Sequence, residues 1–128
     1  MGYITGDYKV YGVRAAAVLT GSYVAGTDIA DVYNYNQLVV EADFTLGSLT
    51  SAEIKVEYSQ DGTNFFQETF SSISGGTDSL TIGAHQMMGT GKYMISLPLL
   101  SKIVRISAKG TGTVTGSSLS LRAILGNV

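Results

Sequence analysis

The stretch YSQDGTNFF places three oxygen-bearing side chains within four residues, namely Asp61, Thr63 and Asn64. Clustered oxygen ligands are what a calcium ion binds, but a calcium loop also needs a bidentate glutamate at its twelfth position. Counted from Asp61, that position is Ser72. The dipeptide Asp61-Gly62 is instead a strong signal for a tight β-hairpin, because glycine adopts positive φ freely. We therefore predict a structural turn at Asp61 and Gly62, with no metal.

One histidine and two acidic pairs are the other residues with the chemistry of a catalytic group. His85 is the only histidine and the chain has no cysteine, so a typical catalytic zinc site cannot be assembled. Glu41 with Asp43, and Glu53 with Glu57, have the residue types of a glycosidase pair. The same spacing also fits the water-facing side of a strand.

The glycine-rich GTGTVTG precedes a strand, whereas a phosphate loop precedes a helix. We predict no catalytic, metal-binding or cofactor-binding residue, and keep a small hydrolase as an alternative.

The chain is weakly charged, and this limits its partners. Charged residues make up 14% of its 128 residues, and the net charge is −2. No run of lysine or arginine is present, so we expect neither nucleic acid nor a membrane as a partner. The start of the chain lacks a charged segment followed by an apolar core, so we expect no signal peptide. A surface rich in serine, threonine and glycine repels neighbours weakly, which suits a subunit covered by other subunits.

Strand-like alternation dominates the chain from Gln37 onward. Apolar residues take every second position in QLVVEADFTL and AEIKVEYS, and again in KIVRISAKG and SSLSLRAIL. Period two places one face of each segment in a core and the other in water. Sixteen glycines interrupt the chain, and no segment has the period and caps of a helix. The pattern predicts an all-β fold, a two-sheet β-sandwich of about eight antiparallel strands.

The first 36 residues differ from the rest, because they contain six of the eight tyrosines. We expect a single domain, in which residues 1–36 contain one or two strands, including Val13–Thr20, and make subunit contacts. Residues 37–128 form the body of the sandwich. Tyr3, Tyr8 and Tyr11 are candidate contact residues, because tyrosine contributes contact area at a low cost in conformational entropy.

Three further residues are candidate contacts with another subunit or a ligand. Phe65 and Phe66 are adjacent in an expected strand, so one points inward and the other outward. Met87 and Met88 lie in a glycine-bounded loop. Methionines there either tuck under the sandwich or form an adaptable contact surface, and the sequence leaves both alternatives open. The candidates are therefore Phe66, Met87 and Met88.

Four stretches, in order, resemble a β-sandwich found in small virion proteins of tailed bacteriophages. They are QLVVEADFTLGS, then AEIKVEYSQDGTNFFQ, then YMISLPLL leading into KIVRISAKGTGT, and finally SSLSLRAIL. Within them, YSQDGTNF is similar to the hairpin of discoidin-like jelly rolls that bind galactose-type ligands, and SKIVRISAKGTGT is similar to a strand and turn of the same class. The resemblance covers about 90 residues and implies a jelly-roll-like sandwich.

The resemblance also implies a function. Such phage domains bind other virion subunits and have no catalytic activity. We therefore expect a capsid decoration or accessory head protein that binds the major capsid protein or other virion subunits and stabilises the assembled shell. It would be located in the virion after assembly in the host cytoplasm, and would form a homo-oligomer, by analogy a trimer. One alternative is a carbohydrate-binding or host-recognition module of a tail or fibre, using Asn64, Phe66 and the segment 85–88. A second is a tail or head–tail connector subunit.

Overall fold

The computed structural model describes residues 5–30, 32 and 34–128, whose regular secondary structure consists of β-strands. Within these ranges there is no helix long and apolar enough to span a membrane. The strands are β1 (Thr5–Ala17), β2 (Val24–Ala25), β3 (Gln37–Thr45), β4 (Leu49–Ser59), β5 (Phe66–Gln67), β6 (Thr69–Ser74), β7 (Thr77–Ile82), β8 (His85–Met87), β9 (Gly91–Pro98), β10 (Ile103–Gly112) and β11 (Ser118–Asn127).

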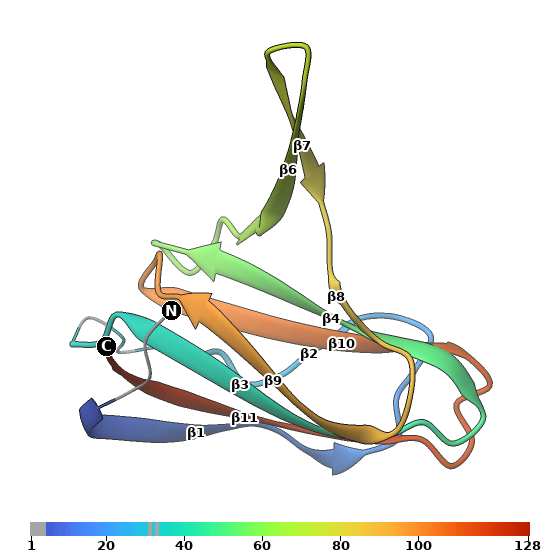
Figure 1. Ribbon diagram of the computed structural model, residues 1–128. Helices are drawn as coiled ribbons and strands as arrows, with labels where there is room; N and C mark the ends of the chain where they lie inside the picture. Colours follow the sequence, from blue (N-terminus) through green and yellow to red (C-terminus); the bar gives the residue numbers. More distant parts are fainter. Residues whose placement is uncertain (1–4, 31, 33) are drawn as a thin grey trace.

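Nine of these strands form the two sheets of a jelly roll (Figure 1). One sheet has the order β1-β11-β3-β9. The other has the order β2-β10-β4, and β8 and β5 pair with the remaining edge of β4. All of these pairings are antiparallel, and strands distant in sequence lie side by side, as in two Greek keys closed around one core. The predicted all-β, two-sheet sandwich is confirmed, and its topology is that of a jelly roll.

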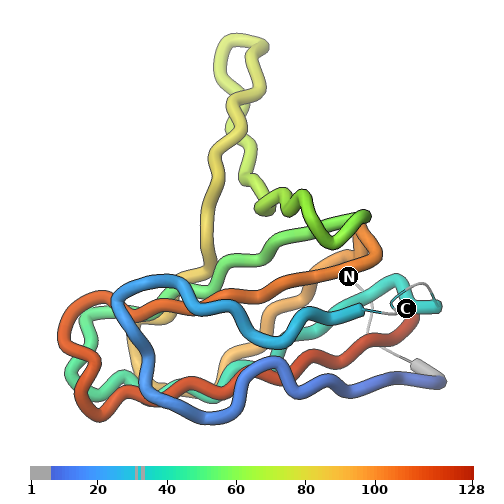
Figure 2. Tube along the Cα trace, turned by 180° about the vertical axis from the view of Figure 1, so that it is seen from behind, coloured from blue at the N-terminus to red at the C-terminus, as the bar shows by residue number. Residues whose placement is uncertain are grey.

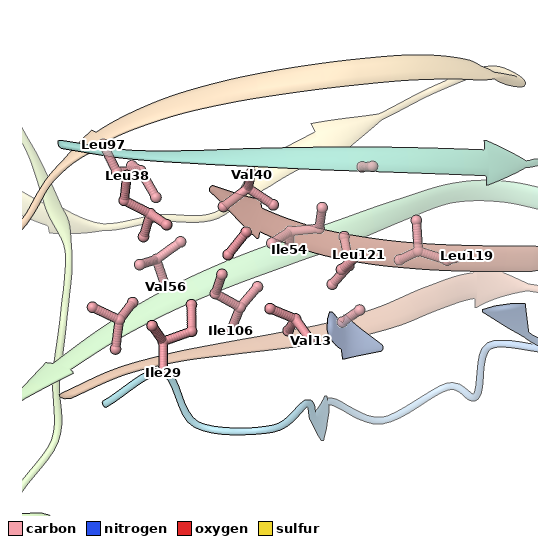
Figure 3. Packing of buried hydrophobic residues seen from close by; sticks show 14 of the residues in the cluster. Val13, Ile29, Leu38, Val40, Ile54, Val56, Leu97, Ile106, Leu119 and Leu121 are labelled. Carbon is pink, nitrogen blue, oxygen red and sulfur yellow. The ribbon is translucent and has the colours of Figure 1, made fainter. Parts of the chain in front are cut away.

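The core lies between the two sheets and is built by alternation (Figure 3). In β3, the side chains of Leu38, Val40, Ala42 and Phe44 point inward and are buried, while the intervening residues are exposed or half-buried. The same pattern runs along β4, β10 and β11. Burial of these side chains is the main favourable contribution to the stability of the sandwich.

The first 36 residues contribute strands to both sheets. β1 is an edge strand that pairs with β11, and β2 pairs with β10. Leu19 and Ile29 are buried in the common core, and Ile29 exchanges backbone hydrogen bonds with Val104. The strand expected at Val13–Thr20 is observed as Thr5–Ala17, so the described part of this segment is built into the sandwich.

Residues 60–84, between β4 and β8, form an insertion in the jelly roll. After the short β5, the chain forms the hairpin β6–β7, which stands away from the sandwich in both views (Figures 1 and 2). Gly75 and Gly76 connect its strands with φ of +59° and +82°. Two consecutive positive φ values between the paired Ser74 and Thr77 match a two-residue type I′ turn, whose twist suits a β-hairpin.

Candidate functional site

Every residue of the two strands of the β6–β7 hairpin is exposed, and the two faces of the hairpin differ. Directly paired residues share a face, and one face combines the pairs Thr69–Ile82, Ser71–Leu80 and Ile73–Asp78. The side chains of Ile73, Leu80 and Ile82 are 75%, 68% and 67% exposed. We call these three residues the hairpin apolar face. The opposite face carries serine and threonine, with Phe70 near the sandwich. Large apolar side chains gathered on a projecting element are typical of a surface that another molecule covers.

Contacts at the base of the hairpin hold it to the sandwich. The side-chain amide of Gln67 donates a 2.9 Å hydrogen bond to the carbonyl of Gly83. Glu68 Oε1 lies 2.5 Å from His85 Nε2, and the edge of the Phe70 ring packs against the same imidazole with the centroids 6.0 Å apart. A Cβ on Gly83 would lie 2.4 Å from the Phe70 ring, so only glycine permits this close packing. The single histidine therefore has a structural environment at this base.

We expect His85→Ala to loosen the hairpin without unfolding the sandwich. The substitution removes the partner of Glu68 and the edge contact with Phe70. Loss of about one charge-assisted hydrogen bond should speed amide hydrogen exchange in β6 and β7 by about tenfold, because local opening becomes easier. Lys92→Ala, which breaks the exposed pair with Asp43 on the other sheet, is the control. Unchanged exchange in β6 and β7 of His85→Ala would contradict this role.

The turn at Asp61 lies at the end of β4, in the loop that leads to β5. Asp61 Oδ1 accepts hydrogen bonds of 2.8 Å from the backbone N–H groups of Thr63 and Asn64, and of 3.1 Å from the Ser59 hydroxyl. Asp61 Oδ2 accepts one from the Asn64 side chain. Gly62 has φ of +77°. These residues form a loop between β4 and β5 that is longer than a two-residue turn. Both carboxylate oxygens thus bind donors within the loop.

The pH dependence of stability should reveal this turn. The backbone N–H donors of Asn64 and Thr63 lower the pKa of Asp61 below its usual range. A carboxylate whose pKa is depressed in the folded state stabilises that state at pH values above its unfolded pKa of about 4. This contribution is lost as the pH falls below that value. We expect Asp61→Ala to lower Tm by several degrees at pH 7, and the difference from wild type to shrink on acidification. Asp78→Ala, at the far end of the hairpin, should show no such change.

The candidate contact residues lie in different parts of the structure. Tyr8 is 65% exposed on the outer face of the β1 sheet, and Phe66 is exposed in β5. Met88 is exposed, whereas Met87 is only 2% exposed and packs in the core, which removes it as a surface contact. Tyr11 donates a hydrogen bond to the carbonyl of Ala30. Tyr3 lies outside the described residues. Asn64, proposed for a glycan contact, uses its side chain in the Asp61 turn.

The acidic pairs point outward from the sandwich and have cationic partners. Glu41 pairs with Arg122, and Asp43 with Lys92 at 3.0 Å, on the outer face of the β1 sheet. These four residues border a groove of about 540 Å³ that extends to Gly12 of β1. On the other sheet, Glu53 and Glu57 pair with Lys109 and Lys55. In the described residues, no group of three or more acidic, histidine or cysteine side chains is placed to hold a metal.

Comparisons with known proteins found solved structures that resemble the chain only weakly. No family model matches the chain, and no curated protein matches it. One similar solved structure is of Bacillus endospore appendages, a family of disulfide-linked pili, with 8% identity, a TM-score of 0.49, and coverage of 98% of this chain and 90% of that one. A structure of infectious bursal disease virus, Gt strain, has 11% identity and a TM-score of 0.28 over 92% of this chain and 39% of that one. Both scores are below 0.5, so neither likeness bears on function.

Proposed function

We propose that this chain is a non-enzymatic structural subunit of a multi-copy assembly, specifically an accessory head protein of a tailed phage. The observation that carries the proposal is the hairpin apolar face, presented on a jelly-roll body. A two-stranded hairpin is marginally stable in water, and its exposed apolar side chains favour coverage by another protein chain. The sequence resemblance to small virion proteins supports the choice of a phage head.

The partners in this proposal are the major capsid protein or other virion subunits, together with further copies of the same chain. Low charge supports this, because a surface with few charges is easily covered by neighbours. In the proposed mechanism, many copies adhere to the shell and bridge its subunits, with repeated geometry set by symmetry. A trimer is the proposed unit, by analogy with the virion proteins that the sequence resembles.

Binding to capsids tests the proposed function. Purified protein should co-sediment with assembled capsids of the encoding phage that lack it, up to a fixed number of copies per shell. Particles from which the gene is deleted should lose this component and disassemble at a lower temperature. Unassembled capsid protein is the control, because a bridging subunit should prefer the shell. Absence of co-sedimentation, together with deletion particles of unchanged composition, would refute the proposal.

A further inference from the structure

A second apolar surface lies on the outer face of the sheet β1-β11-β3-β9. Val10, Ile124 and Val39 are direct neighbours across three strands and point away from the core. Tyr8 lies two residues before Val10 in β1, so its side chain points to the same side, and Met94 lies on β9. Tyr8 and Met94 are 65% and 70% exposed. We call these five residues the sheet patch. Val10, Ile124 and Val39 lie side by side in one row, and Tyr8 and Met94 lie in the rows on either side of it, about 7 Å away.

The hairpin apolar face and the sheet patch cannot cover each other within one chain. The hairpin rises from the side of the sandwich formed by β4 and β10, while β1 and β11 lie on the opposite side (Figures 1 and 2). The hairpin points away from the sandwich and does not reach the outer face of the sheet that carries the patch (Figures 1 and 2). Each therefore stays exposed to water unless another molecule covers it.

The two surfaces match in spacing and in charge. On the hairpin, Ile82, Leu80 and Asp78 follow at two-residue steps on one strand face. On the sheet, the successive outward rows begin with Tyr8, Val10 and Gly12 of β1, at the same steps of about 7 Å. When Ile82 lies over the row of Tyr8, Leu80 lies over that of Val10, and Asp78 with its partner Ile73 lies over the row that runs from Gly12 to Met94.

The row of Gly12 is suited to receive an acidic side chain. Gly12 is paired with Arg122, whose side chain is 60% exposed. A Cβ on Gly12 would meet nothing within 4 Å, and the groove described above begins at this residue. Asp78 is the only charged residue of the hairpin strands. Arg122 is already paired with Glu41 of the same row, but the lining of the groove holds three cations, Arg14, Lys92 and Arg122, against two acids, Glu41 and Asp43. An added carboxylate therefore meets net positive charge.

We propose that the hairpin apolar face of one subunit packs on the sheet patch of a second copy of the chain, with Asp78 beside Arg122. This inference rests on the proposed function and names the partner of the hairpin. The two surfaces are different, so the contact is head-to-tail and every subunit offers one of each. Such contacts propagate until they close into a ring or extend as a filament. A trimer is the ring with three such contacts.

Complementation between two variants tests the contact. Leu80→Lys places a charge on the hairpin apolar face, and Val10→Lys places one on the sheet patch. Both side chains are exposed, so each variant should keep the wild-type Tm. Sedimentation velocity over a concentration series should show wild-type association and, for each variant alone, a dissociation constant raised at least about 30-fold. An equimolar mixture should form a dimer that grows no further, because it retains one intact hairpin and one intact patch. Leu100→Lys, at an exposed apolar residue outside both surfaces, is the control.

Other outcomes would overturn the inference. If Leu80→Lys blocks association but Val10→Lys does not, the hairpin contacts another hairpin or another surface. If the mixture stays monomeric, the two surfaces do not bind each other. A wild-type protein that co-sediments with capsids but stays monomeric alone at every concentration refutes this inference and leaves the proposed function standing. Self-association with the expected variant pattern, without capsid binding, refutes the phage-head function alone.

Discussion

Gly47→Ala is expected to lower the free energy of unfolding by at least about 2 kcal/mol. Gly47 has φ of +58°, a conformation that strains any residue with a Cβ. The added Cβ would also lie 2.4 Å from the carbonyl carbon of Gly116 and 2.6 Å from the nitrogen of Ser117. These atoms belong to backbone, so a change of side-chain rotamer cannot relieve the clash. Strain and overlap therefore add.

The expected size of this effect follows from the place of Gly47 in the fold. It lies in the turn from β3 to β4, and Gly116 in the turn from β10 to β11. Each turn carries the chain from one sheet to the other. The backbone N–H of Ser48 donates a 3.0 Å hydrogen bond to Thr115, so the two turns are joined. Pushing them apart would disturb both sheets at one end of the sandwich.

Denaturant unfolding measures this effect, with Gly21→Ala as the matched control. A Cβ on Gly21 meets nothing within 4 Å, and its φ is not in the positive region. That substitution should change the free energy of unfolding by less than about 0.5 kcal/mol. Equal unfolding midpoints for the two variants would show that the contact between the turns is not rigid.

The sequence predicts the central strands well, and the edge strand poorly. Along β3, strict alternation of apolar and polar residues follows directly from burial on one side only. β1 is different, because register shifts against β11 occur between Gly12 and Arg14 and again before Ala17. Each irregularity breaks the two-residue period. The strand expected at Val13–Thr20 therefore overlaps only the end of β1, and the earlier part of β1 has no periodic signal.

The sequence of the hairpin predicts its turn, but it does not predict that the apolar face of the hairpin is exposed. Gly75-Gly76 between two short strands is a recognised pattern for a type I′ turn. Alternation of Ile73, Leu80 and Ile82 with polar residues, however, would normally indicate a buried face. The sequence cannot show that this face has no core opposite it, because that depends on where β4 and β8 place the insertion. For the same reason, only the strand pairing distinguishes buried Met87 from exposed Met88.

Excision of the hairpin is expected to abolish self-association and leave the sandwich stable. In this variant, Gly-Gly replaces residues 69–82 and joins Glu68 to Gly83. Thr69 and Ile82 are directly paired, so their Cα atoms are about 5 Å apart and a short link suffices. None of the residues 69–82 is buried. The free energy of unfolding should therefore change by less than about 1 kcal/mol, in contrast to Gly47→Ala.

A second variant separates the presence of the hairpin from the chemistry of its apolar face. The triple substitution of Ile73, Leu80 and Ile82 by threonine places β-branched, strand-favouring residues at all three positions but removes most of the apolar area. It should fold with the type I′ turn intact and lose self-association as completely as the excision. If it still associates, the exposed strand edges make the contact, and the apolar side chains do not. If excision unfolds the sandwich, the hairpin contributes to folding, and its exposed side chains no longer argue for a partner.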